Sequence, residues 1–183
     1  MAGTITSNVT VIAGGVETVS SGGVVAIGTV ILGGTVNVSS GGTFENSTVF
    51  SGGKLNVSLG GVVSNTTVST GGAVIVSSGG TAVDLTILSG GSVTVSSGGT
   101  FEFTSGAAGT PNALAGATLE VGSGYVFSGP VNSGVKVEVL SSGTDSGVTV
   151  SSGGSEIVSA GGTASAIIVK APRSSHPAAM LPA

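Results

Sequence analysis

The fold is decided by one short stretch of sequence, Thr35-Val36-Asn37-Val38-Ser39-Ser40-Gly41-Gly42. Its pattern returns with a 19-residue period, in residues 54–61, 73–80 and 92–99. In each copy Val or Leu alternates with another residue, which is the period of a β-strand with one buried face. A fixed repeat of this length is typical of a solenoid, because no single copy can bury its apolar face alone.

Glycine pairs divide the chain at alternating 8-residue and 11-residue intervals, which together make the 19-residue period. We expect each pair to form a tight corner with positive backbone φ, a conformation that costs a residue with a Cβ about 1 kcal/mol or more. Three pairs represent these structural turns: Gly41 and Gly42, Gly79 and Gly80, and Gly98 and Gly99.

The longer half of each repeat, such as residues 43–51, is too long for one straight strand and a turn. We expect it to divide into two short strands with a bend near Asn46, Asn65 and Asp84. Residue i should then lie beside residue i+19, about 4.8 Å away in a parallel sheet. The predicted fold is all-β, a parallel β-helix or solenoid of about nine 19-residue coils.

The repeats extend over most of the chain and predict a single β-solenoid domain in residues 1–170. The pattern weakens near 104–133, where we expect an irregular coil and a protruding loop at 107–113. Residues 116–124 again match the short strand of the repeat. Residues 171–183 are rich in Pro and predict an unpaired tail.

Composition excludes several functions. A formal net charge of -4 with only four Lys and Arg predicts no binding of nucleic acid, and no basic stripe exists. Glycine pairs interrupt every apolar stretch before it reaches the length of a membrane-spanning helix. Cysteine is absent and His176 is the single histidine, so we expect no cofactor, no metal site and no His-based catalysis. Residues 1–12 show no signal-peptide pattern.

The carboxylates give little support for an enzyme. Glu45 and Glu102 share a predicted column but lie three coils apart, about 14 Å, whereas paired glycosidase carboxyls are about 5 to 9.5 Å apart. Asp84 should face away from Glu102. Glu17 and Glu156 occupy inward positions of the first and last short strands. Either they discourage another chain from adding to the open coil, or the end coils are simply relaxed.

Serine pairs precede many of the glycine pairs, and we consider them candidate glycan acceptors. The candidates are Ser39, Ser40, Ser77, Ser78, Ser96 and Ser97. The alternative is that these hydroxyls only form turn hydrogen bonds and keep the surface soluble.

The string Val-Ser-Ser-Gly-Gly-Thr occurs in residues 38–43, 76–81 and 95–100. Together with the 19-residue period it resembles the repeats of AIDA-type autotransporter adhesins, over roughly residues 4–170. The resemblance implies a right-handed β-helical passenger segment on a Gram-negative cell, an adhesin or its stalk, sometimes O-heptosylated on Ser and Thr. The signal sequence and membrane-spanning barrel of that family are not found in this sequence.

These observations predict a non-catalytic structural or adhesive module at the bacterial cell surface or outside the cell. The expected partners are a second copy or a host or bacterial surface, with a glycosyltransferase acting on Ser and Thr. Two alternatives remain. One is a segment of a phage or secreted fibre, and the other is a polysaccharide-degrading β-helix enzyme.

Overall fold

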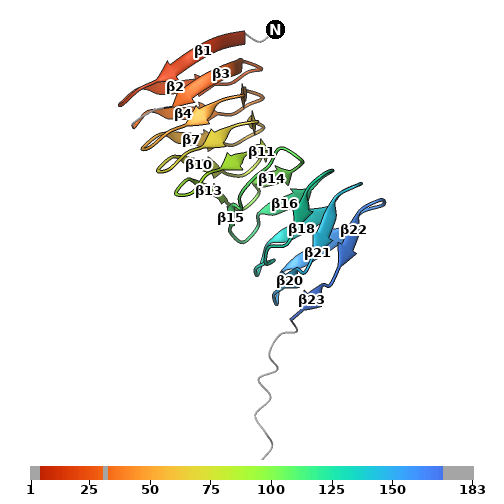
Figure 1. Cartoon of the computed structure of the whole chain (residues 1–183). Helices are drawn as coiled ribbons and strands as arrows, with labels where there is room; N and C mark the ends of the chain where they lie inside the picture. Colours follow the sequence, from red (N-terminus) through yellow and green to blue (C-terminus); the bar gives the residue numbers. More distant parts are fainter. Residues whose placement is uncertain (1–4, 31–32, 171–183) are drawn as a thin grey trace, which may run out of the picture.

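The structure, a computed structural model, describes residues 5–30 and 33–170, and every regular element in these ranges is a β-strand. The strands pair in parallel and stack as a β-solenoid of about eight turns, close to the nine expected (Figure 1). The fold class predicted from the repeat is therefore confirmed. The predicted tail, residues 171–183, lies outside the described residues, as does His176 within it.

The coils from β1 to β15, which we call the N-terminal stack, have three faces. The first face consists of β2 (Val16–Val19), β4 (Thr35–Val38), β7 (Lys54–Val57), β10 (Ala73–Val76), β13 (Ser92–Val95) and β15 (Asn112–Ala113). The second face consists of β5 (Thr43–Glu45), β8 (Val62–Ser64), β11 (Thr81–Val83) and β14 (Thr100–Phe103). The third face consists of β6 (Thr48–Val49), β9 (Thr67–Val68) and β12 (Thr86–Ile87). Strands β1 (Ile5–Val11) and β3 (Val24–Val30) each run along both the second and third faces, and their pairing has register shifts around Ser7.

From β2 to β13 the register of the first face matches the predicted 19-residue period, and β15 pairs with β13 at an 18-residue spacing. Val36 pairs with Leu55, Leu55 with Val74 and Val74 with Val93 along the first face. These side chains point inward and are almost completely buried. Since each inward residue touches its equivalents in the coils before and after, the core is a continuous column of mostly Val.

The predicted bends are also confirmed. Asn46, Asn65 and Asp84 all have positive φ, between 45° and 52°, and each separates a strand of the second face from one of the third. Asn and Asp tolerate this left-handed conformation better than other residues with a Cβ. Ile27 occupies the equivalent place in β3, which is a single strand, and Asn8 occupies it in β1 with a φ of 58°.

The two glycines of a corner are required for different reasons. The Gly42 N–H donates to the Ser39 carbonyl at 2.8 Å and closes a tight turn. Gly41 has a φ of 78°, as expected from the sequence. Gly42 does not have positive φ, but a Cβ there would lie 2.9 Å from the Ser20 nitrogen of the preceding coil. The second glycine therefore provides space between coils rather than conformational freedom.

The coils from β16 onward form a second stack, which we call the C-terminal stack. Its strands are β16 (Thr118–Val121), β17 (Val126–Phe127), β18 (Lys136–Val139), β19 (Thr144–Ser146), β20 (Thr149–Val150), β21 (Ser155–Val158), β22 (Thr163–Ser165) and β23 (Ile168–Val169). Only the second face continues as one sheet from the N-terminal stack into the C-terminal stack. At this point β14 pairs with β16 at a spacing of 18 residues instead of 19. The first-face sheet ends at β15, and separate sheets begin with β17 and β20. Figure 1 shows the stack bending at this junction.

The junction corrects two expectations. By sequence, β18 and β21 are short strands of the repeat, yet they continue the second face and not the first. Residues 107–113 do not protrude as a loop: Ala108 bridges to Thr86, Pro111 is buried, and β15 pairs with β13. The short-strand pattern that begins at Ser92 in β13 returns only at Thr118 in β16, 26 residues later, so equivalent sequences move to a neighbouring face at the junction.

Aromatic side chains fill the junction. The chain has five Phe and one Tyr, and four of these six residues gather here, with Phe103 at the centre. Its ring centroid lies 4.7 Å from that of Phe101, 4.6 Å from Tyr125 and 5.6 Å from Phe127. These large rings occupy the interior where the two stacks are offset and where a Val column would leave empty volume.

Candidate functional site

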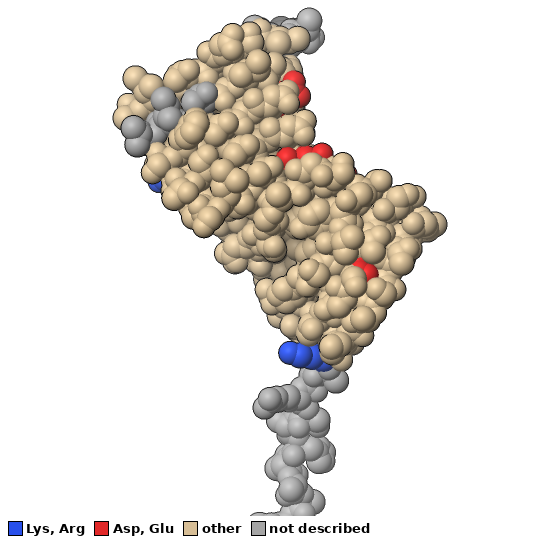
Figure 2. Space-filling model, in the orientation of Figure 1, with Lys and Arg blue, Asp and Glu red and all other residues tan. Residues whose placement is uncertain are grey.

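The candidate functional site is the outer surface of the solenoid, where equivalent side chains of successive coils form columns. Figure 2 shows that the visible face carries few charged atoms, in agreement with four Lys and Arg and eight Asp and Glu in the whole chain. Uncharged side chains therefore dominate what a partner would touch, and they include exposed apolar residues such as Phe50, Leu59 and Leu88.

The predicted acceptor serines lie in one line of corners, between the first and second faces. In each pair the first serine is half-buried and the second is exposed. The backbone of the first serine is fully used: the Ser77 N–H donates to the Val57 carbonyl, and the Ser77 carbonyl accepts from the Gly80 N–H, both at 2.8 Å. A role in glycan attachment stays a prediction. The best candidates are the exposed serines, Ser40, Ser78 and Ser97.

Asparagine side chains form a short ladder on the first face. The amide of Asn56 donates to the side-chain oxygen of Asn37 at 2.9 Å, one coil away. The same outward position is occupied by Ile75 and Thr94 in the next two coils, so the ladder ends after two members. Ile75 is thus the one apolar member of this column, with polar side chains on both sides of it.

A ladder of three glutamates was not predicted from the sequence. Glu102, Glu120 and Glu138 occupy facing positions on β14, β16 and β18, across the junction on the second face. Their 18-residue spacing hides them from a search at the 19-residue period. Facing residues on neighbouring strands are about 4.8 Å apart, so three carboxylates stand in a row on the outer surface.

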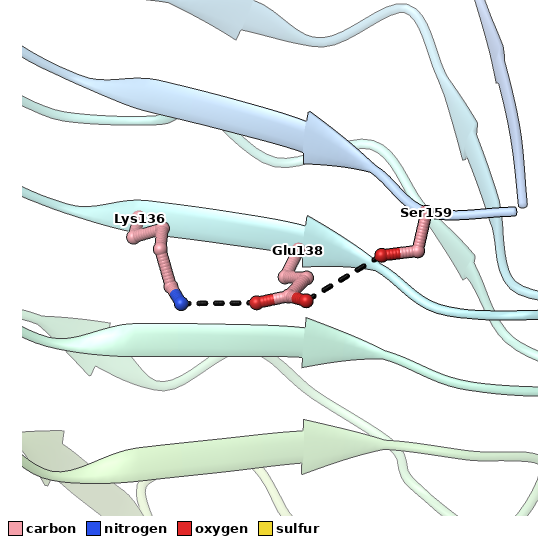
Figure 3. Close-up of polar contacts among 3 residues, drawn as sticks. All are labelled: Lys136, Glu138 and Ser159. Atoms are coloured by element: carbon pink, nitrogen blue, oxygen red, sulfur yellow. Dashed lines mark hydrogen bonds and ion pairs between the residues drawn. The ribbon is translucent and has the colours of Figure 1, made fainter.

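One lysine offsets the charge at one end of this glutamate ladder. Figure 3 shows Lys136 beside Glu138 on β18, with an Nζ to Oε2 distance of 2.9 Å. The Ser159 hydroxyl donates to the other carboxylate oxygen at 3.4 Å. The hydrogen bond and charge of Lys136 lower the pKa of Glu138 from its usual value.

Glu120, the middle member, is affected in the opposite direction. Partial burial raises the pKa of the Glu120 carboxyl, and the charges of Glu102 and Glu138 raise it further, while Lys136 lowers it. The ladder therefore places a carboxyl that retains its proton more readily between two carboxylates.

The acids singled out from the sequence are not brought together. Glu45 faces Ser64 in the next coil, and no acid stands opposite it. The Asp84 carboxylate accepts hydrogen bonds from the backbone N–H and hydroxyl of Thr104. It therefore stabilises the start of the junction. Glu17 is half-buried in β2, the first strand of its face.

Within the described residues, no group of three or more His, Cys, Asp or Glu is arranged to hold a metal ion. No helix in this part of the chain could cross a membrane. What the geometry offers is a long, weakly charged surface with repeated features, and the fold defines the chain as a parallel β-solenoid of sequence repeats.

Among solved structures, the chain is similar to the crystal structure of a TibC-catalysed, hyper-glycosylated fragment of TibA. The sequence identity is 28% and the TM-score 0.47, over 91% of this chain and 86% of that chain. No family model and no curated protein matches the chain. Because the TM-score is below 0.5, the function proposed below rests on the repeat pattern and geometry of the chain itself.

Proposed function

We propose that this chain is a non-catalytic structural and adhesive module, the β-helical stalk or self-association segment of a bacterial surface adhesin of the AIDA type. The observation that supports this proposal is the repetition of corners and outward columns at a 19-residue register along the first face from β4 to β13. A wall of parallel strands closed by tight corners is a stiff spacer, and its surface offers the same contact in coil after coil.

Repetition determines how such a surface binds. A contact made by one coil raises the local concentration of the next contact, so the total affinity grows with the number of coils engaged. Each contact can then be weak. A partner with its own repeats, such as a second copy of this chain, gains most from this arrangement, and a host or bacterial surface gains in the same way.

The proposal includes display at the cell surface or outside the cell, and modification of the corner serines by a glycosyltransferase. The exposure of Ser40, Ser78 and Ser97 supports the second point, because a transferase has to reach the hydroxyl. A weakly charged surface rich in hydroxyls is compatible with lateral association in either the bare or the modified form.

Deletion of whole coils tests the proposal. Removing residues 54–72 joins Gly53 to Ala73 and leaves equivalent neighbours in register. Removing residues 54–91 takes out two coils in the same way. Beads coated with each form should clump progressively less as coils are lost, while circular dichroism shows an intact β fold. A control deletion of 54–63, half a coil, should disrupt the fold. If clumping is unchanged by both whole-coil deletions, or is absent in the full chain, the repeats are not the adhesive element.

One observation favours a second candidate, cleavage of a polysaccharide. Glu102 and Glu120 stand one strand apart, near the separation of about 5 to 5.5 Å found between the two carboxyls of retaining glycosidases. The raised pKa of Glu120 would suit a general acid, with Glu102 as the second carboxyl. Release of reducing sugar from a polysaccharide panel, lost in Glu120→Gln and kept in Glu45→Gln, would support this candidate over the first.

A further inference from the structure

The C-terminal stack has an acid in its interior. Asp145 occupies the inward position of β19, where it pairs with Phe127 of β17 and Ala164 of β22, and it is 0% exposed. The equivalent position of the repeat holds Phe44 and Phe101 in the N-terminal stack. A carboxyl group therefore stands where the fold otherwise places apolar side chains.

A second acid lies close to it. Glu156 is the inward residue of β21, where it pairs with Val137. Both side-chain oxygens of Asp145 and Oε2 of Glu156 are buried without a hydrogen-bond partner. Two carboxylates can only accept hydrogen bonds, whereas one added proton lets one carboxyl donate to the other. Buried polar groups are nearly always paired, so this pair is short of one proton.

Among the described residues, the neighbouring strands supply no other charge to compensate. Phe127 and Ala164 on the flanking strands are apolar, and on β18 the charged pair Lys136 and Glu138 belongs to the outward column. Burial and the charge of Glu156 raise the pKa of Asp145 to about 7. The closed coil thus binds a proton more tightly than an open coil with solvated carboxyls would.

The acid pair lies at the open end of the described solenoid. Within the described residues the sheets end at β21, β22 and β23, and every residue of β22 and β23 is exposed. A cavity of about 440 Å³ beside Glu156 opens to solvent, and Val158 and Val169 in its lining are 45% and 74% exposed. Local opening costs the least free energy where few apolar contacts are buried, so this coil is expected to open more easily than the coils inside the stack.

We propose that one proton shared between Asp145 and Glu156 holds the last coil, β21 to β23, closed, and that this coil opens locally when the proton is lost. Opening exposes the edges of β18, β19 and β20 together with the apolar interior, which are surfaces that other strands can pair with. The last described coil then acts as a cap that is closed when this proton is bound and opens when it is lost.

The direction of the pH effect follows from linkage. Asp145 binds its proton more tightly in the closed coil than the ordinary value of 3.8 for an open one. Closing is therefore favoured at low pH and weakens by about tenfold per pH unit between about pH 4 and 7. Above about pH 7 both states have lost the proton, and the closing constant becomes independent of pH.

Hydrogen exchange of the full chain, corrected for the intrinsic pH dependence of amide exchange, tests the proposal. Protection factors in residues 155–169 should fall about fiftyfold between pH 5 and pH 7. Those in residues 54–83, within the N-terminal stack, should stay constant and serve as an internal reference. Asp145→Asn, which has the same shape and does not titrate, should remove the pH response of 155–169. Glu102→Gln, on the outer glutamate ladder, should retain it.

Three results would overturn the proposal. The first is equal behaviour of residues 155–169 and 54–83 in the unsubstituted chain. The second is an unchanged pH response in Asp145→Asn or, if that variant does not fold, in Asp145→Val, which restores an apolar side chain of the kind found in the N-terminal stack. The third is a response that disappears on tenfold dilution of the protein, since opening within one chain does not depend on concentration.

Discussion

A methyl group added at Gly80 should cost much more stability than one added at Gly79, although both glycines belong to one corner. Gly79 has a φ of 75°, and a Cβ there would lie 3.3 Å from the Leu59 Cα, a tight but tolerable distance. At Gly80, a Cβ would lie 2.6 Å from the Val57 carbonyl carbon and 2.9 Å from the Ser58 nitrogen of the preceding coil. Backbone atoms of a neighbouring coil cannot rotate away as a side chain can.

The two costs differ in origin and in size. Alanine at Gly79 is strained by its left-handed backbone, which costs about 1–2 kcal/mol. Alanine at Gly80 forces two coils apart by about 1 Å, since ordinary carbon contacts are about 3.5–4 Å. The separation weakens the hydrogen bonds from Ser77 N–H to Val57 (2.8 Å) and from Thr81 N–H to Gly61 (3.0 Å). At about 1 kcal/mol for each bond, with unpaired buried groups added, we expect about 3–5 kcal/mol.

Urea denaturation followed by far-UV circular dichroism measures both costs. The midpoint should fall slightly for Gly79→Ala and steeply for Gly80→Ala. Gly79→Asn is the matched control, because Asn46 and Asn65 already adopt positive φ in this chain, and it should be milder than Gly79→Ala. Equal midpoints for the two alanine variants, or a lower one for Gly79→Ala, would show that space between coils does not require the second glycine.

Three further predictions concern the core, the junction and the glutamate ladder. Val74→Asp puts an unpaired carboxylate into a site that is 1% exposed, so it should lower the melting temperature severely, while Asn56→Asp on the outer face should have little effect. Phe103→Ala should cost about 3–5 kcal/mol in denaturant titrations, and Phe50→Ala, at a site that is 40% exposed, much less; similar losses would mean that the aromatic cluster does not hold the junction. Glu120→Gln should raise the melting temperature at pH 7 and at low salt, because the raised pKa of Glu120 makes its ionised form unfavourable in the fold. That gain should shrink in high salt and below pH 4, and a loss of stability at pH 7 would contradict the assigned repulsion.

Much of the fold could be predicted because it depends on local rules that every repeat obeys. Alternation around Val36 identifies an inward face, and the following glycines locate the corner. The bends could be placed because Asn46 and Asn65 stand at the one position of the longer segment that needs a left-handed residue. A 19-residue register then follows from parallel stacking alone.

The features that could not be predicted depend on contacts between coils. Residues 116–124 have the pattern of a short strand, so these residues alone do not show that β16 continues another face. The 18-residue spacing hid the facing positions of Glu102 and Glu120. The burial of Asp145 was not predicted, because the predicted inward column of the longer segment covered only the N-terminal coils. The need for space at Gly42 comes from the backbone of the preceding coil and leaves no sign in sequence.

Whether Glu17 and Glu156 prevent the addition of further chains stays a prediction. Both lie in the outermost strand of their sheets, β2 and β21, as the sequence placed them. Glu17 pairs with Val36 of the next coil, whereas Glu156 shares the interior with Asp145. The two ends of the described solenoid therefore differ chemically, and only the C-terminal one has a partner with which to share a proton.

The change of face at the junction also sets the directions in which the molecule can reach its neighbours. Serine corners such as Ser77 and Ser78 line the edge between the first and second faces of the N-terminal stack. Their equivalents in the C-terminal stack, Leu140 and Ser141, follow β18 and so lie on the opposite edge of the second face. If the corners carry the contacts proposed above, the two stacks present them on different sides of the molecule. A partner bound along the corners of one stack would then leave those of the other stack free for a second partner.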